Sequence, residues 1–245
     1  MYFIGNWKMF GSVKSINYIN SVIKLAKLSK FKKAKIVYCP PYTILSEFVK
    51  KTKNTKIKVG AQNCHHEKNF GPYTGFINAK MIKLIGAKYI IIGHSENRRA
   101  GDTDKLINLK VKSSLSENLQ VIFCFGETLK ERKKNKTFQV IKKQIYMGLK
   151  NLKNLKNIIF AYEPVWSIGS GKVLNNNDLE SQIIIIKNYL KKKFKIKNPK
   201  IVYGGSVNPN NIKSLVEIRT LKGFLIGGAS QKSKKFIDII KKSIN

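Results

Sequence analysis

The sequence has few cysteines, few acidic residues and no long apolar run, and each shortage excludes a class of protein. Its three cysteines, Cys39, Cys64 and Cys124, are an odd number, widely spaced and free of CxxC, which argues against a disulfide framework or a zinc site. No apolar run approaches the roughly eighteen residues of a membrane span. The first residues lack the basic and apolar regions of a signal peptide. We therefore expect a cytoplasmic protein in a reducing compartment, with no membrane segment.

Acidic residues number 13 against 48 lysines and arginines, which gives a formal net charge of +35. Such an excess is typical of proteins that bind nucleic acid or anionic membranes. Here the lysines are dispersed over every predicted helix, and no RNA-binding signature with interleaved aromatic residues accompanies them. Lys, Asn and Ile are abundant and share A/T-rich codons, so we interpret the charge as mutational bias and expect no specific nucleic-acid partner. The charge would still attract a small anionic substrate.

Short apolar, β-branched runs alternate with longer segments of helical period through the whole chain. The predicted strands are residues 2–5, 36–39, 57–61, 89–93, 121–124, 158–161, 201–203 and 224–226. The clearest helical segments are residues 13–28, 43–51, 104–115, 138–149, 177–194 and 232–241. In the first of these, the helical spacing of Ile16, Ile19, Ile23 and Ala26 predicts one buried face.

This alternation, with no linker and no break in composition, predicts one α/β domain over residues 1–245. The expected architecture is a (β/α)8 TIM barrel, in which eight parallel strands are ringed by helices. An open, doubly wound sheet is the alternative, but the Gly-rich fingerprint that should follow its first strand is missing.

A barrel brings the residues that follow its strands to one face, where active sites form. The polar and glycine residues at the predicted strand ends are Asn6, Lys8, Gln62, Asn63, His94, Ser95, Glu96, Glu127, Glu163, Ser206, Gly227 and Gly228.

Four of these residues could together form a proton-transfer site. Glu163 opens a stretch with a proline, the apolar pair Val165-Trp166 and two glycines, a composition typical of a lid that excludes water. Lost hydration would raise the pKa of this carboxyl and its strength as a base. His94 precedes a possible short helix, whose positive end favours a neutral imidazole that donates a hydrogen bond. Lys8 would supply a fixed cation, and Asn6 a neutral donor.

Two glycine pairs, in residues 203–207 and 226–230, follow consecutive predicted strands. Glycines let backbone N–H groups approach phosphate oxygens, and the last two loops of a barrel often bind phosphate. A base, an oxygen polariser, a cation and a phosphate site together indicate proton abstraction next to a carbonyl on a small phosphorylated compound, through an enediolate. This chemistry requires no cofactor and no metal.

Six segments carry a resemblance to a known family: residues 5–9, 92–96, 124–128, 161–172, 203–207 and 227–230. In these motifs, and in their order, the whole chain resembles the triosephosphate isomerases. The resemblance implies interconversion of dihydroxyacetone phosphate and D-glyceraldehyde 3-phosphate, in glycolysis and gluconeogenesis. It implies that Glu163 is the base, that His94 is the electrophile, and that Lys8 and Asn6 bind substrate, with Glu96 as a supporting carboxylate. The implied phosphate contacts are Gly169, Ser206, Gly227 and Gly228.

The resemblance also implies a homodimer, in which the loop of residues 71–75 places Thr74 near Asn6 of the partner subunit and His94 of the partner subunit. The chain departs from the family's usual residues at several positions, and none of these removes a chemical group from the core site. The departures are Asn97 for Arg, Phe76 for Glu, Lys222 for Asp, Ser167 for Ala, Ser170 for Thr, and Val173-Leu174 for Thr-Ala.

Two other hypotheses remain at this stage. The chain could be a basic nucleic-acid-binding protein on an inactive barrel, which a steep salt dependence of duplex binding would reveal. It could also be another phosphosugar barrel enzyme, although such an enzyme does not require this combination of Asn, Lys, His and Glu.

Overall fold

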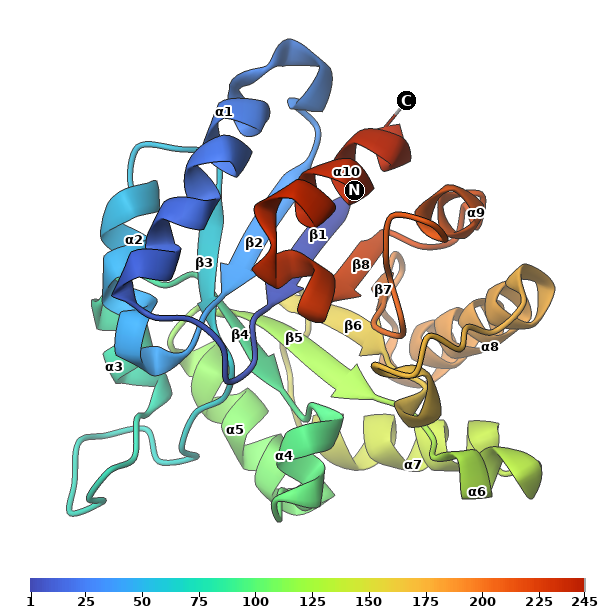
Figure 1. The fold of residues 1–245 in the computed structure, drawn as a ribbon. Coiled ribbons are helices and arrows are strands. Elements are labelled where there is room, and N and C mark those ends of the chain that lie inside the picture. Colours follow the sequence, from blue (N-terminus) through green and yellow to red (C-terminus); the bar gives the residue numbers. More distant parts are fainter. Residues whose placement is uncertain (245) are drawn as a thin grey trace.

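A computed structural model describes residues 1–244 and shows a closed barrel of eight parallel strands in sequence order (Figure 1). The strands are β1 (Tyr2–Asn6), β2 (Lys35–Cys39), β3 (Lys58–Ala61), β4 (Tyr89–Ile92), β5 (Gln120–Phe125), β6 (Ile158–Tyr162), β7 (Lys200–Tyr203) and β8 (Gly223–Ile226). Each lies within one residue of its predicted ends. The first strand pairs with the last, Tyr2 opposite Gly223, which closes the barrel. The predicted parallel barrel is therefore confirmed, and the open-sheet alternative is wrong.

Ten α-helices in residues 1–244 surround the strands (Figure 1). They are α1 (Asn20–Lys27), α2 (Leu45–Thr52), α3 (Ala79–Leu84), α4 (Ser95–Arg99), α5 (Asp104–Ser116), α6 (Leu129–Lys133), α7 (Thr137–Leu149), α8 (Asn176–Phe194), α9 (Ile212–Val216) and α10 (Ser233–Ile244). Short 3₁₀ turns precede or follow several of them, at Val13–Ile19, Ser29–Phe31, Tyr42–Ile44, Val165–Ser167 and Gly228–Gln231.

The first helical segment differs from its prediction. Residues Val13–Ile19 form a 3₁₀ turn and only Asn20–Lys27 is α-helical, after a capping box between Ser12 and Ser15. Serine and asparagine compete with the backbone for hydrogen bonds, and this segment contains several of them. The buried face also shifts: Ile23 is only partly buried, and the neighbouring Val22 is fully buried in its place.

Two apolar layers hold the barrel together. The inner layer fills the barrel with alternate strand residues such as Ile4, Val37, Ile91 and Val202. The outer layer packs the other face of each strand against the helices. Burial of this kind stabilises by about 25 cal/mol per Å² of apolar surface. Because the interior is filled with side chains, space for a ligand is left at the strand ends.

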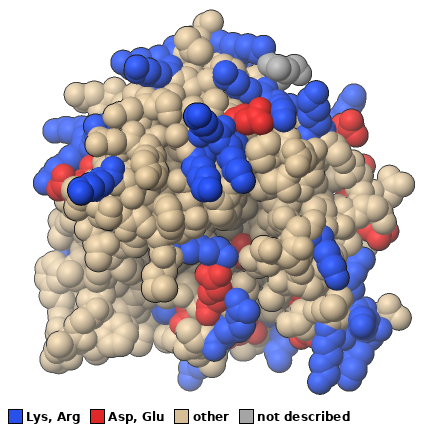
Figure 2. All heavy atoms as spheres, in the orientation of Figure 1, with Lys and Arg blue, Asp and Glu red and all other residues tan. Residues whose placement is uncertain are grey.

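Lysines and arginines lie over much of the face shown in Figure 2, with few acidic residues among them. They do not gather on one helix or in one stripe of this face. Within residues 1–244, no helix has the length and apolar character needed to cross a membrane.

Candidate active site

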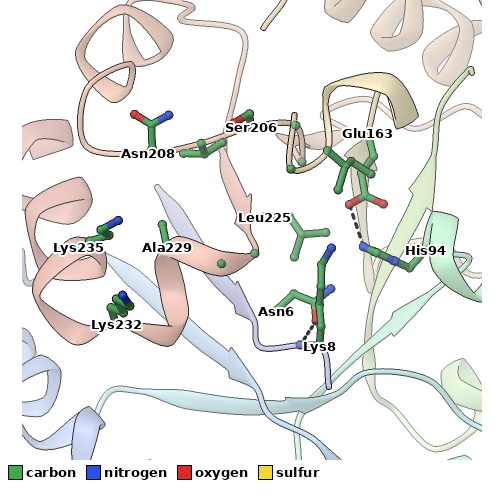
Figure 3. A pocket seen from close by; sticks show the side chains of 17 residues that line it. Asn6, Lys8, His94, Glu163, Ser206, Asn208, Leu225, Ala229, Lys232 and Lys235 are labelled. Atoms are coloured by element: carbon green, nitrogen blue, oxygen red, sulfur yellow. Dashed lines mark hydrogen bonds and ion pairs between the residues drawn. The ribbon is translucent and has the colours of Figure 1, made fainter. Parts of the chain in front are cut away.

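A cavity of about 280 Å³ lies at the carboxyl ends of the strands, where the sequence predicted an active site. In Figure 3, Glu163 and His94 face each other on one side, Asn6 and Lys8 lie in the middle, and Ala229 lies on the opposite side. The cavity lining includes eight of the predicted site residues: Asn6, Lys8, His94, Glu163, Gly169, Ser206, Gly227 and Gly228.

Glu163 directly follows β6, and its backbone N–H donates to the Phe125 carbonyl 2.8 Å away. Its side chain is almost wholly buried, with 3% of the residue exposed. Burial raises the pKa of this carboxyl, and the nearby His94 opposes the rise. A Cβ on Gly204 would lie 2.5 Å from Glu163 Cγ, so only glycine leaves room for the carboxylate. Its Oε2 has no hydrogen-bond partner among residues 1–244, so the carboxylate keeps one oxygen free to accept a proton.

His94 lies at the start of α4 and caps this short helix. Its Nδ1 accepts the backbone N–H of Glu96 at 3.2 Å, so the ring proton of a neutral imidazole must sit on Nε2. Nε2 lies 3.5 Å from Glu163 Oε1. The residue is 4% exposed. The geometry thus presents the Nε2–H of His94 beside a buried carboxylate.

Lys8 has a left-handed backbone, with φ of 56°, which is uncommon for a bulky residue and typical of functional sites. Two side chains hold it there: its N–H donates to Asn6 Oδ1 at 3.0 Å, and Gln62 Nε2 donates to its carbonyl at 2.9 Å. The Lys8 ammonium lies 2.6 Å from Glu96 Oε1. Burial alone would raise the pKa of Glu96, but the hydrogen bond from Lys8 contributes to a net lowering. Glu96 lies outside the cavity lining and holds the cation that lies within it.

The opposite end of the cavity is built from glycine-rich loops and lysines. A Cβ on Gly228 or Gly169 would meet no atom within 4 Å, so both backbones border open space. Lys232 and Lys235 also line this end, and neither was predictable because lysine is common throughout the chain. Backbone N–H groups and cations suit an anionic group such as phosphate.

The predicted lid contributes Ile168 and Gly169 to the cavity lining. Trp166 Nε1 donates to Glu127 Oε1 at 3.0 Å, and the Tyr162 hydroxyl donates to Glu127 Oε2 at 3.1 Å. Glu127 is fully buried, and burial raises the pKa of its carboxyl. Glu127 was predicted at a strand end, with no role of its own. The structure makes it the acceptor that fixes the lid's tryptophan.

Thr74 lies on the exposed loop between β3 and α3, outside this cavity's lining. Large apolar side chains on the same loop are exposed, Phe70 by 63% and Phe76 by 61%. The Phe76 ring packs on His65, with ring centroids 4.6 Å apart. Asn63, another strand-end residue, also lies outside the cavity and accepts a hydrogen bond from Lys110 at 3.1 Å.

Comparison with known proteins gives one result throughout. The family model for triosephosphate isomerase matches residues 1–243. The chain is 40% identical to the triosephosphate isomerase of Alkaliphilus metalliredigens (strain QYMF) over 96% of both chains, and 40% identical to that of Clostridium botulinum (strain Okra / Type B1) over 96% of both. It is also similar to the crystal structure of triosephosphate isomerase from Bartonella henselae, with 34% identity, 98% of each chain covered and a TM-score of 0.88. The chain belongs to the triosephosphate isomerase family.

Proposed function

We propose that this chain interconverts dihydroxyacetone phosphate and D-glyceraldehyde 3-phosphate, with Glu163 as the base. The observation that carries the assignment of the base is the buried Glu163 carboxylate beside the Nε2 of His94, in a cavity whose far end suits a phosphate. Membership of the family supports the substrate. The reaction belongs to glycolysis and gluconeogenesis.

Binding begins with the phosphate. Backbone N–H groups of Gly169, Gly227 and Gly228, together with Ser206, would receive it at the glycine-rich end. Lys8 would neutralise part of its charge, and Asn6 would donate toward the carbonyl region. This placement leaves the carbonyl and its neighbouring carbon at the Glu163 end, where water is excluded by the lid.

Proton transfer then follows in three steps. Glu163 removes a proton from carbon one of dihydroxyacetone phosphate, and the C–H electrons form the enediolate with its charge on the oxygen of carbon two. His94 Nε2–H and the Lys8 ammonium stabilise that oxygen. The oxygen of carbon two gains the hydroxyl proton of carbon one, and Glu163 returns its proton to carbon two to give the aldehyde.

Burial and neighbouring hydrogen bonds fit Glu163, His94 and Lys8 to these roles. Burial strengthens Glu163 as a base, because a raised pKa brings it closer to the operating pH. The bond from the Glu96 amide fixes the His94 tautomer that donates, and the Glu96 carboxylate holds Lys8 in position. Glu96 therefore supports the site without touching the reacting carbons.

We further infer that residues 1–245 form one catalytic domain that acts as a cytoplasmic homodimer. The exposed apolar loop around Thr74 supports this, since a monomer rarely leaves several large aromatic side chains in water. Thr74 would then lie near Asn6 of the partner subunit and His94 of the partner subunit. Sedimentation velocity tests the dimer: Thr74→Arg should give monomers with lower activity, and an unchanged dimer would reject this interface.

The function is tested by steady-state isomerisation of glyceraldehyde 3-phosphate at low and high salt. Glu163→Gln should lose about 10²–10⁴ in kcat, the share of a positioned acid–base group. Glu47→Gln, a matched change at a partly exposed glutamate of α2 outside the cavity, should keep full turnover. Near-normal turnover in Glu163→Gln would reject the base, and no turnover in the folded, unsubstituted protein would reject the function.

A further inference from the structure

The lid carries a serine at a position where the family resemblance expects alanine. Ser167 ends the 3₁₀ turn Val165–Ser167 and is fully buried, with 0% of the residue exposed. Three groups surround its hydroxyl oxygen: the Lys172 carbonyl at 2.6 Å, the Tyr203 hydroxyl at 3.0 Å and the Ser206 backbone N–H at 3.2 Å. Lys172 belongs to the far arm of the lid, and Tyr203 and Ser206 belong to β7 and the loop after it. One hydroxyl thus contacts both arms of the lid and the loop beneath.

The hydrogen-bonding capacity of each group fixes the direction of these bonds. A serine hydroxyl donates one hydrogen bond and accepts two. The Lys172 carbonyl can only accept, so the Ser167 proton points to it. The Ser206 N–H can only donate, so the Tyr203 hydroxyl donates to the remaining lone pair of Ser167. The hydroxyl is fully used, and its burial keeps water from replacing any partner.

The neighbouring loop is shaped around this hydroxyl. A Cβ on Gly205 would lie 2.6 Å from Ser167 Oγ and would overlap the Tyr203 hydroxyl. Real Cβ atoms essentially never approach other atoms so closely. Glycine at this position therefore lets the loop that carries Ser206 meet the lid directly.

We propose that Ser167 is a positioning residue that ties the lid to the Ser206 loop at the phosphate end of the cavity. The inference rests on the proposed function, in which this loop meets the substrate phosphate. The Ser206 N–H donates to the lid in this structure, so the position of the lid and the shape of the phosphate end depend on the same hydroxyl. The lid and this loop are therefore already ordered against each other before substrate binds.

The test compares Ser167→Ala, Tyr203→Phe and the double variant. Without the hydroxyl, we expect the Ser206 amide to exchange its hydrogen about tenfold faster and Trp166 fluorescence to shift in the substrate-free protein, because a net hydrogen bond contributes a factor of about 2–12. We expect kcat/KM to fall about tenfold, mainly through KM, because substrate binding must now order the lid against the Ser206 loop. The losses of kcat/KM in the two single variants should not multiply in the double variant, since both substitutions remove the hydrogen bond between the Ser167 and Tyr203 hydroxyls.

Ser170→Ala is the matched control. Among residues 1–244, the Ser170 hydroxyl bonds only within the lid: its one proton is shared between the Trp166 and Ser167 carbonyls, and its oxygen accepts the Lys172 N–H at 3.2 Å. Any loss of kcat/KM in Ser170→Ala should therefore multiply with the loss in Tyr203→Phe when the two substitutions are combined.

Two results would overturn the proposal. Unchanged exchange of the Ser206 amide in Ser167→Ala would show that the hydroxyl does not tie the loop. A lower KM in that variant would show that the hydroxyl competes with the substrate phosphate for the amide. Amide hydrogen exchange and fluorescence are measured without substrate, so their outcome does not depend on whether the isomerase assignment is correct. If Ser167→Ala does not fold, Tyr203→Phe alone should weaken protection of the Ser206 amide, and unchanged protection there also rejects the tie.

Discussion

Two buried glutamates in this structure should respond to the same substitution with opposite changes in stability. Burial raises the pKa of both Glu163 and Glu127, so burial alone predicts that an uncharged glutamine would stabilise either site. Their hydrogen bonds differ. Glu163 Oε2 has no partner among residues 1–244, whereas Glu127 accepts from the Tyr162 hydroxyl and from Trp166 Nε1.

The magnitudes follow from these partners. Glu163→Gln removes a buried charge but leaves an unpaired polar atom in its place, so the gain is the extra cost of burying the charged form, about 1 kcal/mol or more. Glu127→Gln turns one acceptor into an NH₂ group that faces a donor, and should lose about 1–3 kcal/mol. Since 1 kcal/mol shifts the Tm of a domain of this size by about 2–4 °C, we expect Glu163→Gln to melt at least about 2 °C higher and Glu127→Gln at least about 2 °C lower.

The pH dependence adds a second check. A carboxyl whose pKa is raised in the folded state reduces stability above that pKa, and the penalty shrinks as pH falls from the raised pKa toward the ordinary pKa of glutamate. The gain in Glu163→Gln should therefore be full above the raised pKa and shrink on acidification. Thermal unfolding of the substrate-free proteins over a series of pH values measures both effects. A lower Tm for Glu163→Gln at the alkaline end of the series, or equal shifts of one sign in both variants, would refute this reasoning.

Three further predictions concern activity and stability. On acidification, kcat/KM should fall as Glu163 becomes protonated, at a pH above the ordinary range of a glutamate because burial raises its pKa; a pH–rate profile measures this. Lys8→Met should lower kcat/KM by about 10²–10³ with little change in Tm, because the partner Glu96 is 42% exposed and can be hydrated; an unchanged kcat/KM would remove Lys8 from the site. Lys110→Ala should destabilise the fold by about 3–5 kcal/mol in urea unfolding, because it removes the ammonium that lies 2.7 Å from the carboxylate of Asp102, whose side chain is only 10% exposed.

The barrel was predictable because the strand pattern repeats cleanly. Each buried strand is a short β-branched run, and these runs mark their own ends. The helices α3, α6 and α9 were missed because segments of five or six residues are too short to show a helical period. The turn at Val13–Ile19 looked helical because its isoleucines have helical spacing, and its polar residues shifted the backbone to 3₁₀ geometry.

The cavity residues were predictable for a related reason. A parallel barrel brings its strand ends together, so a list of those ends already contains Asn6, His94 and Glu163. Contacts between distant side chains were not predictable. Glu127 meets Trp166 and Ser167 meets Ser206 across 39 residues in each case, and nothing in the local sequence signals either pair. The lysines at the phosphate end gave no signal because lysine occurs everywhere in this chain.

The most direct test of the proposed chemistry is to convert glyceraldehyde 3-phosphate in D₂O and count deuterium in the product by mass spectrometry. If Glu163 takes a proton from carbon and exchanges it with solvent at the enediolate stage, product molecules should carry one deuterium on carbon one. The same product should form far more slowly in Glu163→Gln. Rapid conversion with no deuterium in the product, at a rate that Glu163→Gln leaves unchanged, would indicate that hydrogen moves directly between the carbons and would contradict the assignment of Glu163 as the base.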